Sequence, residues 1–210
     1  NAEFAGIVTA TQFVGNGANL TGVASTENIR TNTNATFLQN INVGVAITAG
    51  KLGIGFTDNN VKIGSTALDA LTTGTNNTAV GSASLTATTT GARNVAVGYE
   101  SLLNLTTGDD NTALGTGALN ACTTASDNVA VGRNALVSNT TGNNHAVVGA
   151  TAGDANTTGV NLTAIGFNAA GANTTGDNNT AVGKDALASS TTATNLVAIG
   201  AFALKQNTGS

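Results

Sequence analysis

The sequence predicts an all-β protein, a repetitive β-solenoid or β-roll with 17-residue coils that pack as a homotrimer. The first of three observations is that an aliphatic residue followed by glycine recurs every 17 residues. The second is the abundance of Val, Ile and Thr, which favour strands over helices. The third is the length of the unit, which is too short for two helices with their turns but sufficient for one circuit of a narrow solenoid.

The repeat is most visible as a column of nine glycines, each 17 residues after the one before it. An aliphatic residue precedes every one of them, and Ala or Ser stands three residues after it. We expect nine complete units and a partial tenth within residues 58–210, which form the solenoid domain. The repeat glycines are Gly64, Gly81, Gly98, Gly115, Gly132, Gly149, Gly166, Gly183 and Gly200.

Each column of the repeat has an expected place in the coil, because side chains alternate between the two faces of a strand. The aliphatic residue before glycine, such as Val97, is expected to point into the core, and Leu102 to fill its opposite corner. Glycine marks a bend or a close backbone approach. Asn at the turn, as at Asn111, is expected to form a ladder between coils. The alanine column, including Ala113, is predicted to offer a smooth face for contact between chains.

Residues 1–57 lack the period and are predicted to form a separate N-terminal β collar or connector. Phe4 to Val14 alternates like a strand, and Gly15-Asn16-Gly17 is a turn signal. Single coils bury too few apolar side chains to be stable alone. Stability therefore depends on stacking and, we expect, on the association of several chains.

Composition argues against several functional classes. The chain contains 37 Thr, 29 Asn and 27 Gly, whereas aromatic residues make up 3% and charged residues 9%. One His, one Cys and scattered acids are poor catalytic material, so we expect no enzyme and no cofactor. A net charge of −4 offers no basic surface for nucleic acid. No apolar run reaches the ~18 residues of a membrane-spanning helix, so membrane insertion is not expected.

Single reactive groups are interpreted as structural. His145 replaces Asn at the turn; as the only His it could sense pH or bind metal, but it has no second ligand at a recognisable spacing. Cys122 is expected to be a buried or half-buried thiol rather than a nucleophile. Turn acids could bind Ca²⁺, but the calcium-binding nonapeptide is absent and solvated turns are the better interpretation. These acids are Asp109, Asp110, Asp127 and Asp177.

Aromatic and charged residues gather at the variable positions after the column glycine. We predict that they form an outer contact strip for a glycan or a protein, with ordinary surface decoration as the alternative. The candidate residues are Tyr99, Glu100, Arg133, Asn134, Phe167, Asn168, Lys184, Asp185 and Phe202.

The string Asn-Thr-Ala-Val-Gly at 77–81, with Asn-Val-Ala-Val-Gly at 94–98 and 128–132, resembles the head repeats of trimeric autotransporter adhesins. Those repeats form a left-handed parallel β-roll, although their unit is usually shorter. The segments 6–13 and 15–23 resemble fibre proteins of tailed bacteriophages, notably phages of marine cyanobacteria. Together the resemblances imply a homotrimeric tail or capsid fibre on the virion surface. Such a fibre is a rigid spacer whose partners are itself, other virion proteins and a host surface glycan or protein.

Two alternatives remain open. A bacterial trimeric surface adhesin would carry the same repeat on the cell surface. An ice-binding β-solenoid is suggested by eight stacked Thr-Thr pairs and low charge, although adjacent residues of a strand point to opposite faces.

Overall fold

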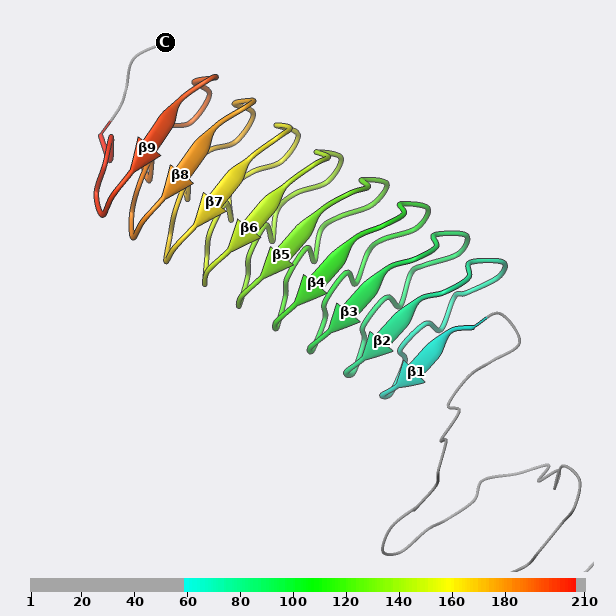
Figure 1. Cartoon of the computed structure of the whole chain (residues 1–210). Helices are drawn as coiled ribbons and strands as arrows, with labels where there is room; N and C mark the ends of the chain where they lie inside the picture. Colours follow the sequence, from blue (N-terminus) through cyan, green and yellow to red (C-terminus); the bar gives the residue numbers. More distant parts are fainter. Residues whose placement is uncertain (1–58, 207–210) are drawn as a thin grey trace, which may run out of the picture. The chain divides into compact units, whose positions relative to one another are not determined.

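The computed structural model describes residues 59–206, which form a β-solenoid of nine short parallel strands and contain no helix (Figure 1). The predicted collar of residues 1–57 lies outside the described residues. The strands are β1 (Val61–Ile63), β2 (Thr78–Val80), β3 (Val95–Val97), β4 (Thr112–Leu114), β5 (Val129–Val131), β6 (Ala146–Val148), β7 (Thr163–Ile165), β8 (Thr180–Val182) and β9 (Val197–Ile199).

The strands stack in sequence order into one sheet, and each pairs with the equivalent residues of the next coil. Val95, for example, is opposite Thr112, and Ala96 is opposite Ala113. The register therefore advances by 17 residues at every step, which confirms the predicted all-β solenoid and its period. At about 4.8 Å between strands, the nine strands extend over about 38 Å.

The centre of each strand from β2 to β9 faces the core, and this reverses the predicted orientation of the strand side chains. Ala96, Ala113 and Ala130 are completely buried, whereas the aliphatic residues before the column glycines are half-exposed or exposed. The expectation that these aliphatic residues point inward was wrong, as was the expectation that the alanines offer a contact face. The interior opposite the strand is already filled by the leucine and asparagine columns, so it has room for a methyl group only.

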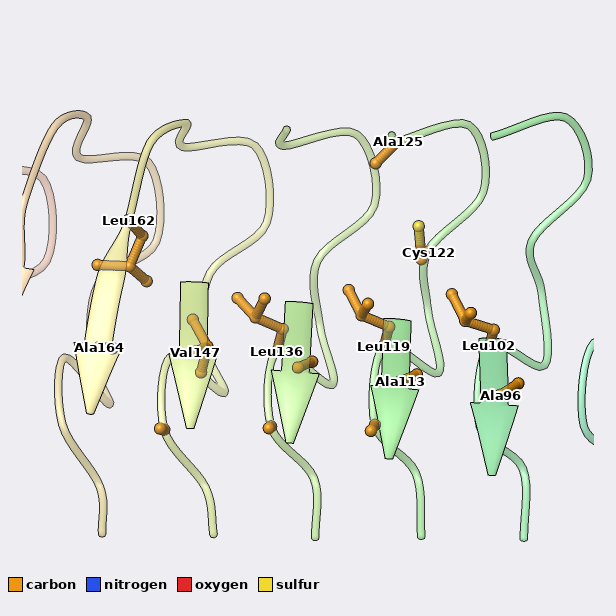
Figure 2. Close-up of a cluster of buried hydrophobic side chains, with 14 of the residues drawn as sticks. Ala96, Leu102, Ala113, Leu119, Cys122, Ala125, Leu136, Val147, Leu162 and Ala164 are labelled. Carbon is orange, nitrogen blue, oxygen red and sulfur yellow. The ribbon is translucent and has the colours of Figure 1, made fainter. Parts of the chain in front are cut away.

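The leucine column supplies the bulk of the core, as predicted. Leu102, Leu119 and Leu136 are completely buried and lie in one row between the coils (Figure 2). Each has a positive φ of about 50°, a conformation that L-residues other than Asn, Asp and Gly seldom adopt. This turn directs the leucine into the coil, so that burial of the side chain offsets the cost of the backbone conformation.

The asparagine column forms the predicted ladder between coils. The backbone N–H of Asn111 donates to Oδ1 of Asn94 at 2.9 Å, and its own Nδ2 donates to the carbonyl of Ala125 at 2.8 Å. Its Oδ1 accepts the backbone N–H of Asn128 at 3.2 Å. Each buried carboxamide thereby satisfies backbone groups that the turn leaves without a partner.

Glycine is required at the column position because successive coils approach closely there, which confirms the predicted role of the glycine column. Gly115 has φ +136°, and a Cβ at this residue would lie 2.6 Å from the carbonyl oxygen of Gly132. Farther along the coil, the first residue of each Thr pair adds a side-chain ladder. Thr106 Oγ1, for example, donates to the carbonyl of Thr123 at 2.9 Å.

The coils around Gly153 depart from the repeat without leaving the core empty. Gly153 stands where most coils have Leu, and Leu162 stands where most have Asn. A Cβ at Gly153 would lie 3.0 Å from Cδ2 of Leu162 and 3.2 Å from Cδ2 of Leu136. Leu162 thus fills the volume that the missing leucine vacates, and Val147 adds bulk where β2–β5 and β7–β9 have Ala (Figure 2).

Candidate interaction surface

The most continuous functional surface is the outer face of the sheet, which we define as the first and third residues of strands β1–β9. Eighteen side chains project from it, and none is charged. Its third-residue column is entirely aliphatic, and its first-residue column contains Val, Ala and Thr. Val129 is 41% exposed and Ile165 is 43% exposed. The alternation of the strands turns these residues outward because their central neighbours occupy the core.

Nearly all the exposed large apolar side chains of the described residues lie on this face or directly after it. Seven of them belong to the outer face: Ile63, Val95, Leu114, Val129, Val148, Ile165 and Val197; Ile199 at the last strand is an eighth. The others, Tyr99, Phe167, Phe202 and Leu204, follow the column glycines. The solenoid is therefore apolar on one side only, a distribution that marks an interaction surface.

The predicted contact strip occupies the trailing edge, which we define as the two residues after each column glycine. Its three aromatic rings are all more than half exposed: Tyr99 (54%), Phe167 (53%) and Phe202 (51%). Arg133 and Lys184 are exposed as well. Within residues 59–206 these are the only aromatic residues, so the core is built without rings and the rings are available to a partner.

The remaining strip residues are held by local contacts rather than free. Asn168 donates to Asp185 Oδ1 at 2.7 Å, and Asp185 lies 3.9 Å from Lys205 Nζ. Glu100 raises the pKa of Tyr99 by accepting a hydrogen bond from its hydroxyl group and by its negative charge. Glu100 and Asn134 are half-exposed, whereas Asp185 is buried. The strip residues follow successive column glycines, but Asp185 stabilises the turn and is poorly placed for a ligand.

Two lysines flank the ring of Phe202 at the end of the strip. Lys184 Nζ lies 5.4 Å from the ring centroid and Lys205 Nζ lies 5.0 Å from it. Cations at this distance are attracted to the face of an aromatic ring. This part of the trailing edge is consequently both aromatic and basic.

The opposite side of the outer face is bordered by the leading edge, which we define as the two residues before each member of the asparagine column. Arg93 is held there by both neighbouring acids, with Nε 2.7 Å from Asp110 Oδ1 and Nη2 3.1 Å from Asp109 Oδ2. The guanidinium group lowers the pKa of Asp110 mainly through the hydrogen bond. These two acids therefore make an ion pair and are not arranged as calcium ligands.

His145 occupies the position of a ladder asparagine and takes over part of its role. Its backbone N–H donates to Asn128 Oδ1 at 3.1 Å, and its Nδ1 accepts the backbone N–H of Leu162 at 3.0 Å. Burial lowers the pKa of the imidazole to about 4, although the Gly159 carbonyl and Asp177 oppose the shift. The ring is consequently neutral at physiological pH and belongs to the ladder.

Cys122 is completely buried in the core, as expected for a structural thiol. Burial raises its pKa to about 11, which keeps it protonated and poorly nucleophilic. Residues 59–206 contain no group of three or more His, Cys, Asp or Glu side chains that could hold a metal ion. No helix in this part of the chain is long and apolar enough to cross a membrane.

Sequence reasoning missed the outer face because it placed the aliphatic columns inside. The charges on the leading edge were noticed only as turn acids, although their position two residues before a strand could have been compared with the charges after it. The alternation of residues along each strand could have indicated the outer face, and the charges on both sides of the strand could have indicated the two edges.

The fold and its one-sided apolar surface define the class of this protein as a repeat β-solenoid. No family model, no curated protein and no solved structure matches the chain.

Proposed function

We propose that this chain is a structural, self-associating fibre segment that serves as a rigid spacer, most simply as a homotrimer. The observation that carries the proposal is the outer face, which is uncharged over all nine strands and aliphatic except for four threonines of its first-residue column. In a monomer whose sheet has one face in water, apolar residues of each strand normally point to the core and the alternate residues on the open face are polar. Here the open side carries larger aliphatic side chains than the alanine-lined inner side, which is the arrangement expected of a face that packs against a partner.

The size of the face is sufficient for stable association. It is about 38 Å long, and it is about 20 Å wide when the flanking edges are included, at ~3.3 Å per residue. The resulting footprint of about 760 Å² is close to the ~800 Å² that each partner contributes to an interface of standard size. The regular spacing of the coils also allows two copies to interdigitate along the whole length.

The resemblances in the sequence support a place for this segment in a virion tail or capsid fibre, and a bacterial trimeric surface adhesin is the close alternative. In either setting the trailing edge is the surface we propose for attachment to a host glycan or protein, because its rings remain exposed. Catalysis is not part of the proposal, since the acids of residues 59–206 are distributed among the turns, whereas glycoside hydrolysis requires two carboxyl groups that flank one bond.

Ice binding receives less support from the Thr pairs than their number suggests. The first Thr of each pair uses its hydroxyl to bond the next coil, as Thr140 does to the Thr157 carbonyl at 3.0 Å. The second column, which includes Thr124 and Thr158, is exposed throughout, whereas most of the first column is half-exposed. A single column is narrower than the flat array that ice recognition needs.

The decisive experiment measures the native mass of the chain by light scattering after size-exclusion chromatography. We expect about three times 20.4 kDa. The variant Val129→Lys/Ile165→Lys, which places charges on the outer face, is expected to be monomeric. The matched control Thr124→Lys/Thr158→Lys carries the same charges on the exposed Thr column and should retain the oligomer.

A folded monomer at all concentrations would refute self-association. If that monomer also produced thermal hysteresis in freezing solution, the ice-binding alternative would replace the fibre.

A further inference from the structure

We propose that charges on the two edges of the outer face set the direction and register of a second copy of this chain, holding the copies parallel and level with each other. This inference rests on the proposed self-association and adds the rule by which copies align. The apolar face itself cannot supply that rule, because its columns look nearly the same after every coil.

The two edges flank the outer face symmetrically. The leading edge ends two residues before the first outward residue of a strand, and the trailing edge begins two residues after the last one. At β5, Asp127 and Arg133 hold these positions and both are exposed. The three-residue strand and its flanks separate the two side chains within one chain, so each is directed toward a neighbour rather than toward the other.

Opposite charges occur on the two edges at the same level of the solenoid. At β5 the leading edge carries Asp127 and the trailing edge carries Arg133. At β8 the leading edge carries Asp177, which is half-exposed and lies one position earlier in the repeat than Asp127, and the trailing edge carries Lys184, which is exposed. Asp177 Oδ1 also accepts the backbone N–H of Val160 at 2.8 Å. Within the described part of the chain none of these four side chains forms an ion pair.

The level of β3 follows the same rule with the signs exchanged. Arg93 lies on the leading edge and Glu100 on the trailing edge. Nε and Nη2 of Arg93 bond the acids of the next coil, and Nη1 makes no hydrogen bond to any residue of 59–206. A partner's carboxylate can therefore still be accommodated. At β7 the pattern is apolar, with Val160 on the leading edge and Phe167 on the trailing edge.

Because of symmetry, these charges favour parallel over antiparallel packing of two copies. When copies are parallel, around a two-fold or three-fold axis along the solenoid, the leading edge of one copy lies against the trailing edge of the next. Asp127 then meets the neighbour's Arg133. In a fully overlapping antiparallel pair centred on β5, Asp127 would face Asp127 and Arg133 would face Arg133. Repulsion between these like charges disfavours the antiparallel pair.

Register follows from the same charges. With no shift, opposite charges face each other at the levels of β3, β5 and β8. The one like charge at these levels is Asp185 at β8, which is buried and lies beside Lys205. A shift by any whole number of coils leaves opposite charges at no more than one level. A shift that moves Glu100 one coil forward places it against Asp109 and Asp110. Closed rings require zero shift in any case, so charge and symmetry select the same register.

Cross-linking between two variants tests direction and register together. Chains carrying Asp127→Cys are mixed with chains carrying Arg133→Cys, reassembled and treated with a short bis-maleimide. We expect this level pair to link at least about ten times more than Asp127→Cys mixed with Lys184→Cys, which lie three coils, about 14 Å, apart. The native Cys122 is buried and does not compete.

Three results would overturn the inference. Equal yields for the level pair and the displaced pair would exclude a fixed register, and a higher yield for the displaced pair would exclude zero shift. Efficient linking of Asp127→Cys to itself would show an antiparallel pair. If scattering shows an oligomer and the level pair fails to link, only this inference fails. If scattering shows a monomer, the proposed function fails with it.

Charge exchange gives an independent test. The variant Asp127→Lys/Asp177→Lys makes both edges basic at β5 and β8, and we expect its dissociation constant to rise about tenfold at low salt. Adding Arg133→Asp/Lys184→Asp exchanges the two edges and should restore the constant to within about twofold. Circular dichroism confirms folding of each variant.

The control changes the net charge by the same amount as Asp127→Lys/Asp177→Lys, but on the exposed Thr column. Its substitutions are Thr90→Lys, Thr124→Lys, Thr158→Lys and Thr192→Lys. The control should associate like the native chain. If the control weakened association as much as the reversed edge, or if the exchanged edges failed to restore it in a folded protein, the charges would not set the alignment.

Discussion

His145 shows how a single residue in the ladder makes the stability of the whole solenoid depend on pH. The ring is buried with a pKa of about 4, whereas an unfolded chain has an ordinary histidine pKa near 6.5. The group therefore stabilises the folded state fully above pH 6.5. That contribution is lost as pH falls from 6.5 toward 4, because the unfolded state then binds a proton that the folded state does not.

The expected loss for the native chain is about 3 kcal/mol of unfolding free energy across this pH window. The variant His145→Asn restores the ladder residue and should remove this part of the pH dependence. Urea denaturation of both proteins at pH 7 and pH 4.5 measures the difference. Parallel losses in the two proteins would show that His145 is not responsible.

Gly115→Ala tests the close approach of coils at the glycine column. The added Cβ would meet the backbone carbonyl of Gly132 at 2.6 Å, and φ is +136°. Neither backbone can yield easily, so we expect destabilisation of more than about 3 kcal/mol in chemical denaturation. In the control Gly117→Ala, φ is +67° and the close contact is the end of the Asn134 side chain, so a cost of about 1 kcal/mol is expected.

At the scale of one coil, Gly153 replaces the leucine that usually fills the core, and Leu162, at the position of the ladder asparagine, supplies the missing volume. Gly153→Leu alone should cost about 2 kcal/mol by overpacking against Leu162. Leu162→Asn alone should cost about 3 kcal/mol by leaving a cavity. The double variant restores the repeat pattern, so its destabilisation should be smaller than the sum by more than about 1 kcal/mol. A strictly additive double-mutant cycle would show that the two sites do not share one space.

The sequence was sufficient to predict the elements and their spacing but not which side of each strand is inside. A strict period fixes the stacking, and the roles of Gly115, Leu102 and Asn111 followed from residue chemistry. Alternation, however, defines two faces without identifying the buried one. The prediction chose the bulkier face, whereas the width left by Leu102 and Asn94 admits only Ala96. Likewise, the contact strip was found as a line of residues, but the burial of Asp185 depends on neighbouring coils.

At the scale of the whole molecule, the number of coils is independent of the structure of each coil. Removal of residues 111–127 joins Asp110 to Asn128 and reproduces the Asp127-Asn128 junction of the native chain. We expect this variant to fold, with a solenoid shorter by about 4.8 Å in small-angle X-ray scattering. Removal of 111–119, about half a unit, interrupts every column at the junction and should lower the strand signal in circular dichroism. Equal folding of both variants would contradict a fixed 17-residue register.

The ladders that join the coils also determine how the solenoid responds to mechanical force. Their hydrogen bonds run along its long axis, so a pull at the two ends loads one coil interface at a time instead of shearing many bonds together. Each coil that detaches exchanges about 5 Å of folded length for about 56 Å of extended chain. Anchored at both ends, such a segment would lengthen in regular steps and dissipate a sudden load. Contacts with lateral neighbours in a bundle would raise the force at which the first coil detaches.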